Sequence, residues 1–527
     1  MAPAAPPGVK TTAPAAVKAP VSAPPRRLKV CAIALNEPHE LDVFRANLDP
    51  QRFELIDIRE LAKANGPTDG NTPESSSWIM NACRPEASCD VMVYSSEFAG
   101  RFFGKNGPSL GLQELEEASC KPQCAGLFRQ PLEVFLLACN TLANKSEDSR
   151  TPEEYLQVLL DHGFDRASAE RVVELRYGPL GPSFRESLRR IFAGVPRIYG
   201  FSSVAPRGEY TAPMLAHYFR TKNDYAGSLL HTARATDRNT ALLSSFKGTS
   251  LTQTTGLTPQ ESGTVDRRHI CALYDETRPV ADRLQIAYGF MLRADALSFV
   301  PTLEVFLSRH PASTYSRVEQ SIYTEIQTLD APRDAVLQLV DSLNVSALKL
   351  ELAHFAVLIG WLHPSELHQL AVNGARELFH QPLTAEVVDI MCEITKHASL
   401  RDDFTDDDIP FQFYSDPSGL RLLSCLRPTD RRVSPRIVPA LRSDDWMKRQ
   451  WAAYALTQLM PRDEAVLQQL VPYVYDPDIG LRIRWLFQNQ GELPKSVRRQ
   501  INDIAPTLLQ NAGPAPHSAA PLLTFLP

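Results

Sequence analysis

The sequence predicts an α/β domain that is followed by an all-helical, repeat-like C-terminal half. Up to about residue 224, short apolar runs rich in branched and aromatic residues alternate with helical stretches. From about residue 267, apolar residues recur at helical spacing almost to the end of the chain. Two segments near that end, residues 441–459 and 474–490, look like copies of one unit.

The short apolar runs are the expected strands. They span residues 28–35, 53–58, 90–95, 133–139 and 197–203. Runs of this kind suit strands that are buried on both faces. Helical stretches separate several of them, and this alternation favours a mostly parallel sheet with helices on both faces. One helix has a clear start, with Thr151 as N-cap, Pro152 in the first turn and Glu154 placed to close a capping box.

The two similar C-terminal segments each open with an acidic turn. Basic residues then occupy the first turn of an apolar helix in both segments. This order resembles the HEAT-repeat pattern, in which an Asp-rich turn precedes a helix with basic and small apolar residues. The resemblance implies an irregular α-solenoid.

We expect five parts along the chain. They are an Ala/Pro-rich disordered tail, the α/β domain, a helical connector, the HEAT-like region and a loose tail, at residues 1–26, 27–245, 246–330, 331–510 and 511–527. The first tail lacks the apolar core of a signal peptide.

Composition excludes several classes of partner. Hydrophobic residues make up 43% of the chain and charged residues 22%, as in an ordinary globular protein. A net charge of −6 gives no general attraction to nucleic acid or to an anionic membrane. No run approaches the ~20 apolar residues that span a bilayer. The sequence therefore predicts neither a nucleic-acid nor a membrane partner.

Nine cysteines are scattered through the 527 residues. This density is below that of a disulfide scaffold, and the odd count leaves at least one free thiol. The sequence therefore predicts a reducing compartment, the cytoplasm. Cys83 and Cys89 form a C-x5-C pair, and Cys120 and Cys124 a C-x3-C pair, of which only the second has zinc-like spacing. We expect both pairs to be incidental, and no metal or cofactor.

One cysteine occupies a position suited to chemistry. Residues 133–139 form an expected strand that ends in Cys139, and ligands and reacting groups gather at the carboxyl edge of a parallel sheet. The preceding strand ends in a polar segment at 95–100, which lies at the same edge if the strands are parallel. The alternative is that Cys139 packs as a small core residue.

The order of strand, polar elbow, helix, strand and cysteine resembles the caspase-like cysteine peptidases, above all the branch of clostripain, separase and the CHAT domains. The resemblance covers about residues 28–218 and is specific around Cys139. In this family the nucleophile strand ends in an Ala-Cys step, often with Thr two residues on, and Ala138, Cys139 and Thr141 fit that motif. The resemblance implies that Cys139 stands in the nucleophile position.

The family's general base is missing from its expected place. The strand before the nucleophile should end in His, usually followed by Gly, but Glu97 occupies this position. Imidazole can accept and return the thiol proton near pH 7, and its cation stabilises the thiolate. A glutamate disfavours the thiolate and raises the thiol pKa. His39, His162 and His217 are other histidines of the domain, and none has the expected position.

Residues after the fifth strand would form one wall of a substrate groove in the peptidase interpretation. Ser202, Ser203 and Arg207 would contact a bound peptide there, although solvated loop residues are the simpler alternative. The leading hypothesis is a degenerate peptidase homologue that binds a polypeptide, with a helical half that recruits or senses a protein partner. The alternatives are an active cysteine endopeptidase with an unidentified base, and a non-catalytic scaffold unrelated to peptidases.

Overall fold

The computed structural model describes most of the chain. The described residues are 26–35, 39–65, 78–84, 87–104, 109–145, 150–161, 166–222, 224–231, 237–258, 266–380, 388, 391–392, 394–395 and 398–511. Apart from Arg26 and Asn511, both predicted tails lie outside these residues, and so does His162.

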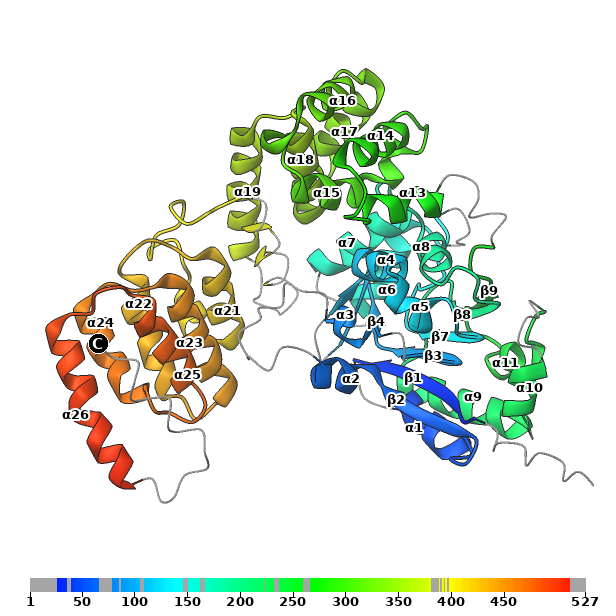
Figure 1. Ribbon diagram of the computed structural model, residues 1–527, viewed down its shortest axis with the longest axis horizontal. Helices are drawn as coiled ribbons and strands as arrows, with labels where there is room; N and C mark the ends of the chain where they lie inside the picture. The colour runs from blue at the N-terminus through cyan, green and yellow to red at the C-terminus, as the bar shows by residue number, and fades with distance from the viewer. Residues whose placement is uncertain are drawn as a thin grey trace, which may run out of the picture.

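A six-stranded sheet forms the centre of the α/β domain (Figure 1). Its order is β2-β1-β3-β7-β8-β9, with bounds Phe53–Asp57, Leu28–Ala34, Val91–Ser95, Glu133–Leu137, Arg197–Phe201 and Leu251–Thr254. The first five strands in this order are parallel, and β9 is antiparallel to β8. The mostly parallel sheet with flanking helices that the sequence predicted is therefore present.

Strand β9 corrects the expectation that strands end after about Asp224. It lies beyond residue 245, where the sequence placed the end of the α/β domain. Its sequence, LTQT, is mostly polar because β9 is an edge strand that joins the sheet through its backbone pairing with β8. An apolar run is a signal for buried strands only.

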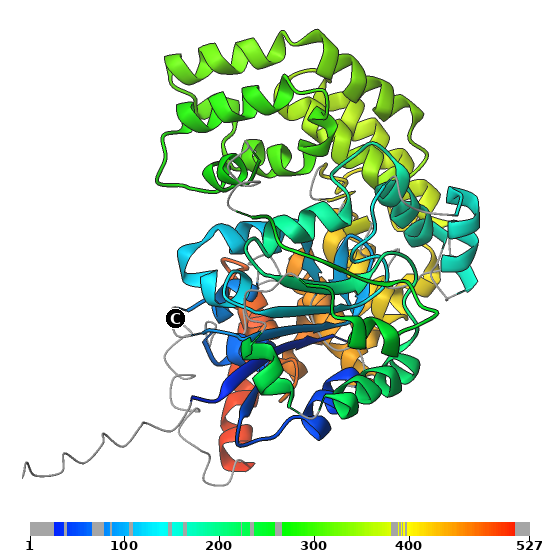
Figure 2. The ribbon, with the colours of Figure 1, turned by 90° about the vertical axis from the view of Figure 1, so that its right-hand side faces the viewer.

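Helices cover both faces of the sheet (Figure 2). Alternate residues of β1 explain this arrangement, because Val30, Ala32 and Ala34 belong to one core and Cys31 and Ile33 to the other. The first core includes α1, α9, α10 and α11 (His39–Asn47, Gly208–Thr221, Tyr225–His231 and Thr240–Ser245). The second includes α2, α3, α4, α5 and α8 (Ile58–Asn65, Ile79–Ala82, Leu112–Cys120, Ala125–Phe128 and Phe184–Ile191).

The C-terminal half is helical, as predicted (Figure 1). Its main helices are α13–α19 (Asp266–Leu273, Val280–Met291, Val300–Arg309, Arg317–Gln327, Asp330–Ser342, Ser346–Ile359 and Pro364–Phe379) and α21–α26 (Pro417–Leu426, Val433–Ile437, Trp446–Leu459, Glu464–Leu470, Gly480–Gln488 and Lys495–Asn511). One hydrophobic core runs through all of them. No described helix has the length and apolar character needed to cross a membrane.

The two acidic turns that the sequence singled out have defined local roles. The Asp445 carboxylate caps α23 by accepting from the backbone N–H of Met447 at 2.9 Å. Arg449 of the same unit reaches the turn of the next unit and pairs with Asp476 at 3.4 Å and also with Asp478. The basic residue of one unit therefore bonds to the acidic turn of the following unit.

Four disulfides correct the sequence-based view of the cysteines. The pairs are Cys31–Cys89, Cys83–Cys124, Cys120–Cys271 and Cys392–Cys425, and Cys139 is free. The C-x5-C and C-x3-C spacings therefore mark no metal clip, and no group of described side chains could hold a metal ion. Partners lie 33 to 151 residues apart, so their spacing in the sequence gave no signal.

These disulfides also bear on the compartment. Disulfides form and persist in oxidising environments. They therefore argue against the reducing compartment, and the cytoplasmic location, that the sequence predicted.

The pairing leads to a direct prediction. In the denatured but unreduced protein, we expect iodoacetamide to label Cys139 alone, because a disulfide sulfur does not react as a thiolate. After reduction, all nine cysteines should be labelled. Peptide mass spectrometry gives the count in both states. Labelling of all nine without reduction would contradict the four bonds.

Candidate functional site

Cys139 lies just beyond the carboxyl end of β7, where the sequence placed the candidate nucleophile. It is partly exposed. The next residue, Asn140, has a left-handed backbone (φ 60°), which ends the strand in a tight turn. The buried Thr141 hydroxyl accepts from the backbone N–H of Phe201 at 3.2 Å and lies 3.2 Å from the carbonyl oxygen of Ala138. The backbone of Asn140 and the hydroxyl of Thr141 therefore fix the turn that presents Cys139.

Glu97 and Cys139 occupy equivalent positions, just beyond the ends of the neighbouring strands β3 and β7. The parallel register pairs Ser95 of β3 with Leu137 of β7, and Glu97 and Cys139 each follow two residues later. Glu97 begins β4 (Glu97–Phe98), the first strand of a small antiparallel sheet with β5 (Arg101–Phe103) and β6 (Leu110–Gly111). Its side chain is exposed. The structure therefore brings the Glu97 carboxylate near enough to the thiol to act on its pKa.

The surroundings of Cys139 favour a neutral thiol. Burial raises the pKa of the thiol, and the negative charge of Glu97 raises it further. The N–H of Ala205, 3.3 Å from Sγ, and the N–H of Cys139 itself act in the opposite direction but do not cancel the increase in pKa. Nucleophilic attack needs the thiolate, so the balance of these interactions opposes catalysis at neutral pH.

His39 and His217 are the described histidines among the other candidates for a base. Among the described side chains, the groups that shift the pKa of Cys139 include no histidine. His39 begins α1 and lies beside Gly208 at the start of α9. His217 lies on α9 with an exposed side chain.

Two shallow pockets flank the loop that bonds to the thiol. One has a volume of about 300 Å³ and is lined by Arg150, Ser203, Val204, Ala205, Pro206, Gly248, Thr249 and Ser250. The other has a volume of about 340 Å³ and is lined by Asp161, Pro206, Arg207 and Tyr210. The shared residue Pro206 follows Ala205, whose N–H bonds to Cys139. The two pockets therefore lie beside the loop at Pro206, and Cys139 lines neither of them.

The three predicted substrate-binding residues have different positions. Ser203 lines the first pocket, where its Oγ accepts a hydrogen bond from Arg150. Arg207 lines the second pocket. The Ser202 hydroxyl instead donates to the carbonyl oxygen of Ser250 at 3.2 Å, so it is engaged inside the protein.

Sequence reasoning missed several residues of this edge. Arg150 and Tyr210 line the pockets, but a single arginine before a helix and a tyrosine on one give no pattern in the sequence. Glu40 was also missed. Its buried carboxylate accepts from the hydroxyls of Ser95 at 2.8 Å and Thr211 at 2.5 Å, and so links α1 and α9 to the end of β3.

The effect of Glu97 on the thiol can be isolated. We expect Glu97→Gln to lower the pKa of Cys139 and so to increase the fraction of thiolate at pH 7.5, because one nearby negative charge is removed. Salt should shrink the difference, since Glu97 is exposed. The measurement is the rate of Cys139 alkylation in both proteins, with Glu153→Gln on the exposed side of α6 (Pro152–Asp161) as the control. Equal rates in all three proteins would show that Glu97 does not act on the thiol.

Comparison with known proteins assigns no family to this chain, since no protein family, no curated protein and no solved structure matches it.

Proposed function

We propose that the α/β domain is a caspase-like, CHAT-like domain that has lost peptidase activity and binds a polypeptide at the carboxyl edge of its sheet. The helical half is a HEAT-like solenoid that recruits or senses a protein partner. The observation that carries this proposal is Cys139 in the nucleophile position with its pKa raised and Glu97 level with it. The mostly parallel sheet with flanking helices is compatible with this fold.

The loss of activity follows from the charge beside the thiol. A cysteine peptidase holds its thiolate next to a cation, and the imidazolium later returns the proton to the leaving amine. Glu97 provides an anion instead. It can accept a proton, but it destabilises the thiolate that must attack the peptide carbonyl.

Binding does not need the thiolate. The pockets on either side of the loop at Pro206 remain open, and they present Arg150, Arg207 and the 59% exposed ring of Tyr210. Aromatic rings and arginines are the side chains that contribute most to protein–protein contacts. A peptide that crosses this edge would therefore find side-chain pockets and polar anchors without being cleaved.

The test compares cleavage with binding in the full chain. The protein and its Cys139→Ala variant are incubated with a fluorescence-quenched peptide library, and both are used to select binders from a displayed decapeptide library. We expect no cleavage, the same binders for both proteins, and their loss in Arg150→Ala and Tyr210→Ala but not in the distant Arg498→Gln. Cleavage that requires Cys139 would establish the active endopeptidase. A lack of selected binders would favour the scaffold unrelated to peptidases.

A further inference from the structure

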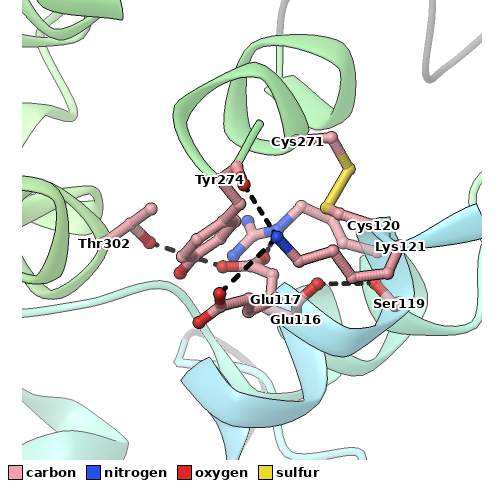
Figure 3. The surroundings of a disulfide bond; sticks show 9 residues. Glu116, Glu117, Ser119, Cys120, Lys121, Cys271, Tyr274 and Thr302 are labelled. Atoms are coloured by element: carbon pink, nitrogen blue, oxygen red, sulfur yellow. Dashed lines mark hydrogen bonds and ion pairs between the residues drawn. A yellow bond between two sulfur atoms is a disulfide. The ribbon is translucent and has the colours of Figure 1, made fainter. Parts of the chain in front are cut away.

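One of the four disulfides joins the two halves of the chain and is partly exposed. Cys120 ends α4 of the α/β domain, Cys271 lies on α13 of the helical half, and both residues are partly exposed (Figure 3). The other two disulfides of the α/β domain are buried, with no cysteine more than 8% exposed, and consist of Cys31, Cys89, Cys83 and Cys124. Thiol–disulfide exchange depends on access to the sulfur atoms. A reductant in solution can therefore reach the bond between α4 and α13 while the protein is folded.

Polar contacts on both sides of this bond hold the two helices in place. Lys121, directly after Cys120, donates to the carbonyl oxygen of Tyr274 at 2.9 Å, just beyond the end of α13 (Figure 3). Glu117, on the last turn of α4, pairs with Arg309 of α15 at 2.7 Å. Neither contact involves a sulfur atom, so both remain when the bond opens. The two thiols then stay close together, and a high effective concentration favours formation of the bond again.

The contacts of α13 divide between the two halves. Ile270, Leu273 and Tyr274 pack into the core of the helical half. Arg283 of α14 donates to the carbonyl oxygen of Leu273 from Nε at 2.9 Å and also from Nη2. Toward α4, the disulfide and the Lys121 hydrogen bond hold the helix. Opening the disulfide should therefore loosen α13 from α4 while α13 stays attached to the helical half.

We propose that the Cys120–Cys271 bond is a reversible redox latch, opened in the folded protein by a dithiol protein. A thiolate of the dithiol attacks one sulfur, which forms a mixed disulfide and releases the other cysteine as a thiolate. The second thiol of the dithiol then attacks the mixed disulfide and releases the remaining cysteine. Two electrons and two protons have then passed to the latch, whose cysteines are thiols, and the dithiol has become a disulfide.

The geometry of the latch favours a dithiol over a monothiol. The released cysteine is held beside the mixed disulfide by the contacts of Lys121 and Glu117. It can therefore attack back, expel the reductant and close the latch. A dithiol competes with this reaction because its own second thiol is also attached to the mixed disulfide. A monothiol needs a second molecule from solution for the same step.

The Cys392–Cys425 bond is the internal comparison. Both of its cysteines are partly exposed, as in the latch. Both belong to the helical half, however, so this bond does not connect it to the α/β domain. Reduction of Cys392–Cys425 should therefore leave the contact between α4 and α13 unchanged.

The first test measures which bonds open in the native full chain, with dithiothreitol as the dithiol. Thiols are trapped with iodoacetamide at intervals and located by peptide mass spectrometry. We expect Cys120 and Cys271 to be labelled at least about tenfold faster than the four buried cysteines, whose bonds need local opening first. Glutathione at the same thiol concentration should open the latch about tenfold less, because closure competes with its second step.

The second test measures the release of α13 by hydrogen exchange. Exchange in α13 should rise on reduction while that of β7 stays unchanged, and it should return to its first rate when oxidised glutathione replaces dithiothreitol. Cys120→Ser with Cys271→Ser should show the faster exchange without any reductant. Cys392→Ser with Cys425→Ser is the matched control and should respond to dithiothreitol as the unmodified chain does.

Several outcomes would overturn the latch. These are labelling of the buried cysteines as fast as Cys120 and Cys271, exchange in α13 that reduction does not change, and faster exchange that spreads to β7 or does not reverse. The latch does not depend on the proposed peptide groove. If the groove selects no peptides, the expected labelling and exchange remain the same.

Discussion

Replacing Glu133 with glutamine is expected to lower the free energy of unfolding of the α/β domain by about 3–5 kcal/mol, the cost of leaving a buried charge without its partner. Glu133 begins β7 and is 3% exposed. Its Oε1 accepts from Arg197 Nε at 2.8 Å, and Arg197 is also 3% exposed at the start of β8. Glutamine keeps the shape of the side chain but removes the negative charge that faces the Arg197 cation.

The same carboxylate is the centre of a larger buried network. The hydroxyls of Tyr199 and Tyr225 donate to it at 2.9 and 2.6 Å. Burial first, and then the Glu133 charge, raise the pKa of both tyrosines above 10. The hydroxyls therefore remain protonated as donors, and stability should be lost only as pH rises above 10, where the unfolded chain releases these protons first.

Hydrogen exchange of peptides from β7 and β8 measures the loss of stability in Glu133→Gln within the α/β domain. A local measurement is needed because the two halves of the chain need not unfold together. Glu153→Gln on the exposed side of α6 is the control and should change stability by less than about 0.5 kcal/mol. The double variant Glu133→Gln with Arg197→Met should be less destabilised than the sum of the single variants, because neither charge is then left unpaired. A loss below about 1 kcal/mol in Glu133→Gln would contradict the role of the pair.

Removing the disulfide between the two halves should have the second-largest effect. Cys120 at the end of α4 joins Cys271 of α13, with a sequence separation of 151 residues (Figure 3). Cys120→Ser with Cys271→Ser should lower the free energy of unfolding by about 2–5 kcal/mol. The matched pair Cys392→Ser with Cys425→Ser opens a separation of 33 residues. It should cost about 1 kcal/mol less, because a shorter loop constrains the unfolded chain less.

In the variant with Cys120→Ser and Cys271→Ser, polar contacts around the missing bond should keep the α/β domain and the helical half together. Glu116 accepts from Arg190 at 2.8 Å and from Thr302 at 3.4 Å, which joins α8 and α15 through α4 (Figure 3 shows Glu116 and Thr302). Glu117 pairs with Arg309 of α15 at 2.7 Å. We therefore expect faster hydrogen exchange in α13 without dissociation of α15. Exchange in α13 equal to that of the unmodified chain would contradict a stabilising role for the bond.

This junction reaches the candidate site through the segment between α7 (Arg166–Tyr177) and α8. Leu180 packs into the core of the helical half, and Gly181 donates to the carbonyl oxygen of Leu297 at 3.0 Å. Lys145, six residues after Cys139, donates to the carbonyl oxygen of Leu180 at 3.0 Å. The turn that presents Cys139 is thus connected to the helical half through the Lys145 side chain and the backbone of residues 180–181.

The sequence predicted the buried part of the molecule better than its edges. The strand at 133–139 was recognisable because every residue after Glu133 is apolar, and the Ala-Cys step placed Cys139 at its end. The sequence did not predict strand β9, because its side chains are mostly polar and its stability comes from backbone pairing with β8. The pocket residues Arg150 and Tyr210 come from separate segments, so only the folded chain brings them to one edge.

The cysteine pairing could not be predicted from local sequence either, because bonded cysteines come from separate segments of the chain. Cys83 and Cys89 look like one pair in the sequence, yet each bonds to a partner in another segment, Cys124 and Cys31. Proximity in space depends on the completed sheet and its helices. The position of Glu97 beside Cys139, by contrast, follows from strand register, since both residues come two positions after the paired residues Ser95 and Leu137.

The central claim is that Cys139 stays protonated at neutral pH because burial and Glu97 oppose the thiolate. The most direct test is the pH dependence of Cys139 alkylation by iodoacetamide in the native protein, with Cys139→Ala as the blank. We predict labelling that rises only above about pH 8.5, as for an ordinary or suppressed thiol, and a shift to lower pH in Glu97→His. Fast, selective labelling of the unmodified chain below pH 7 would show a stabilised thiolate and contradict the account.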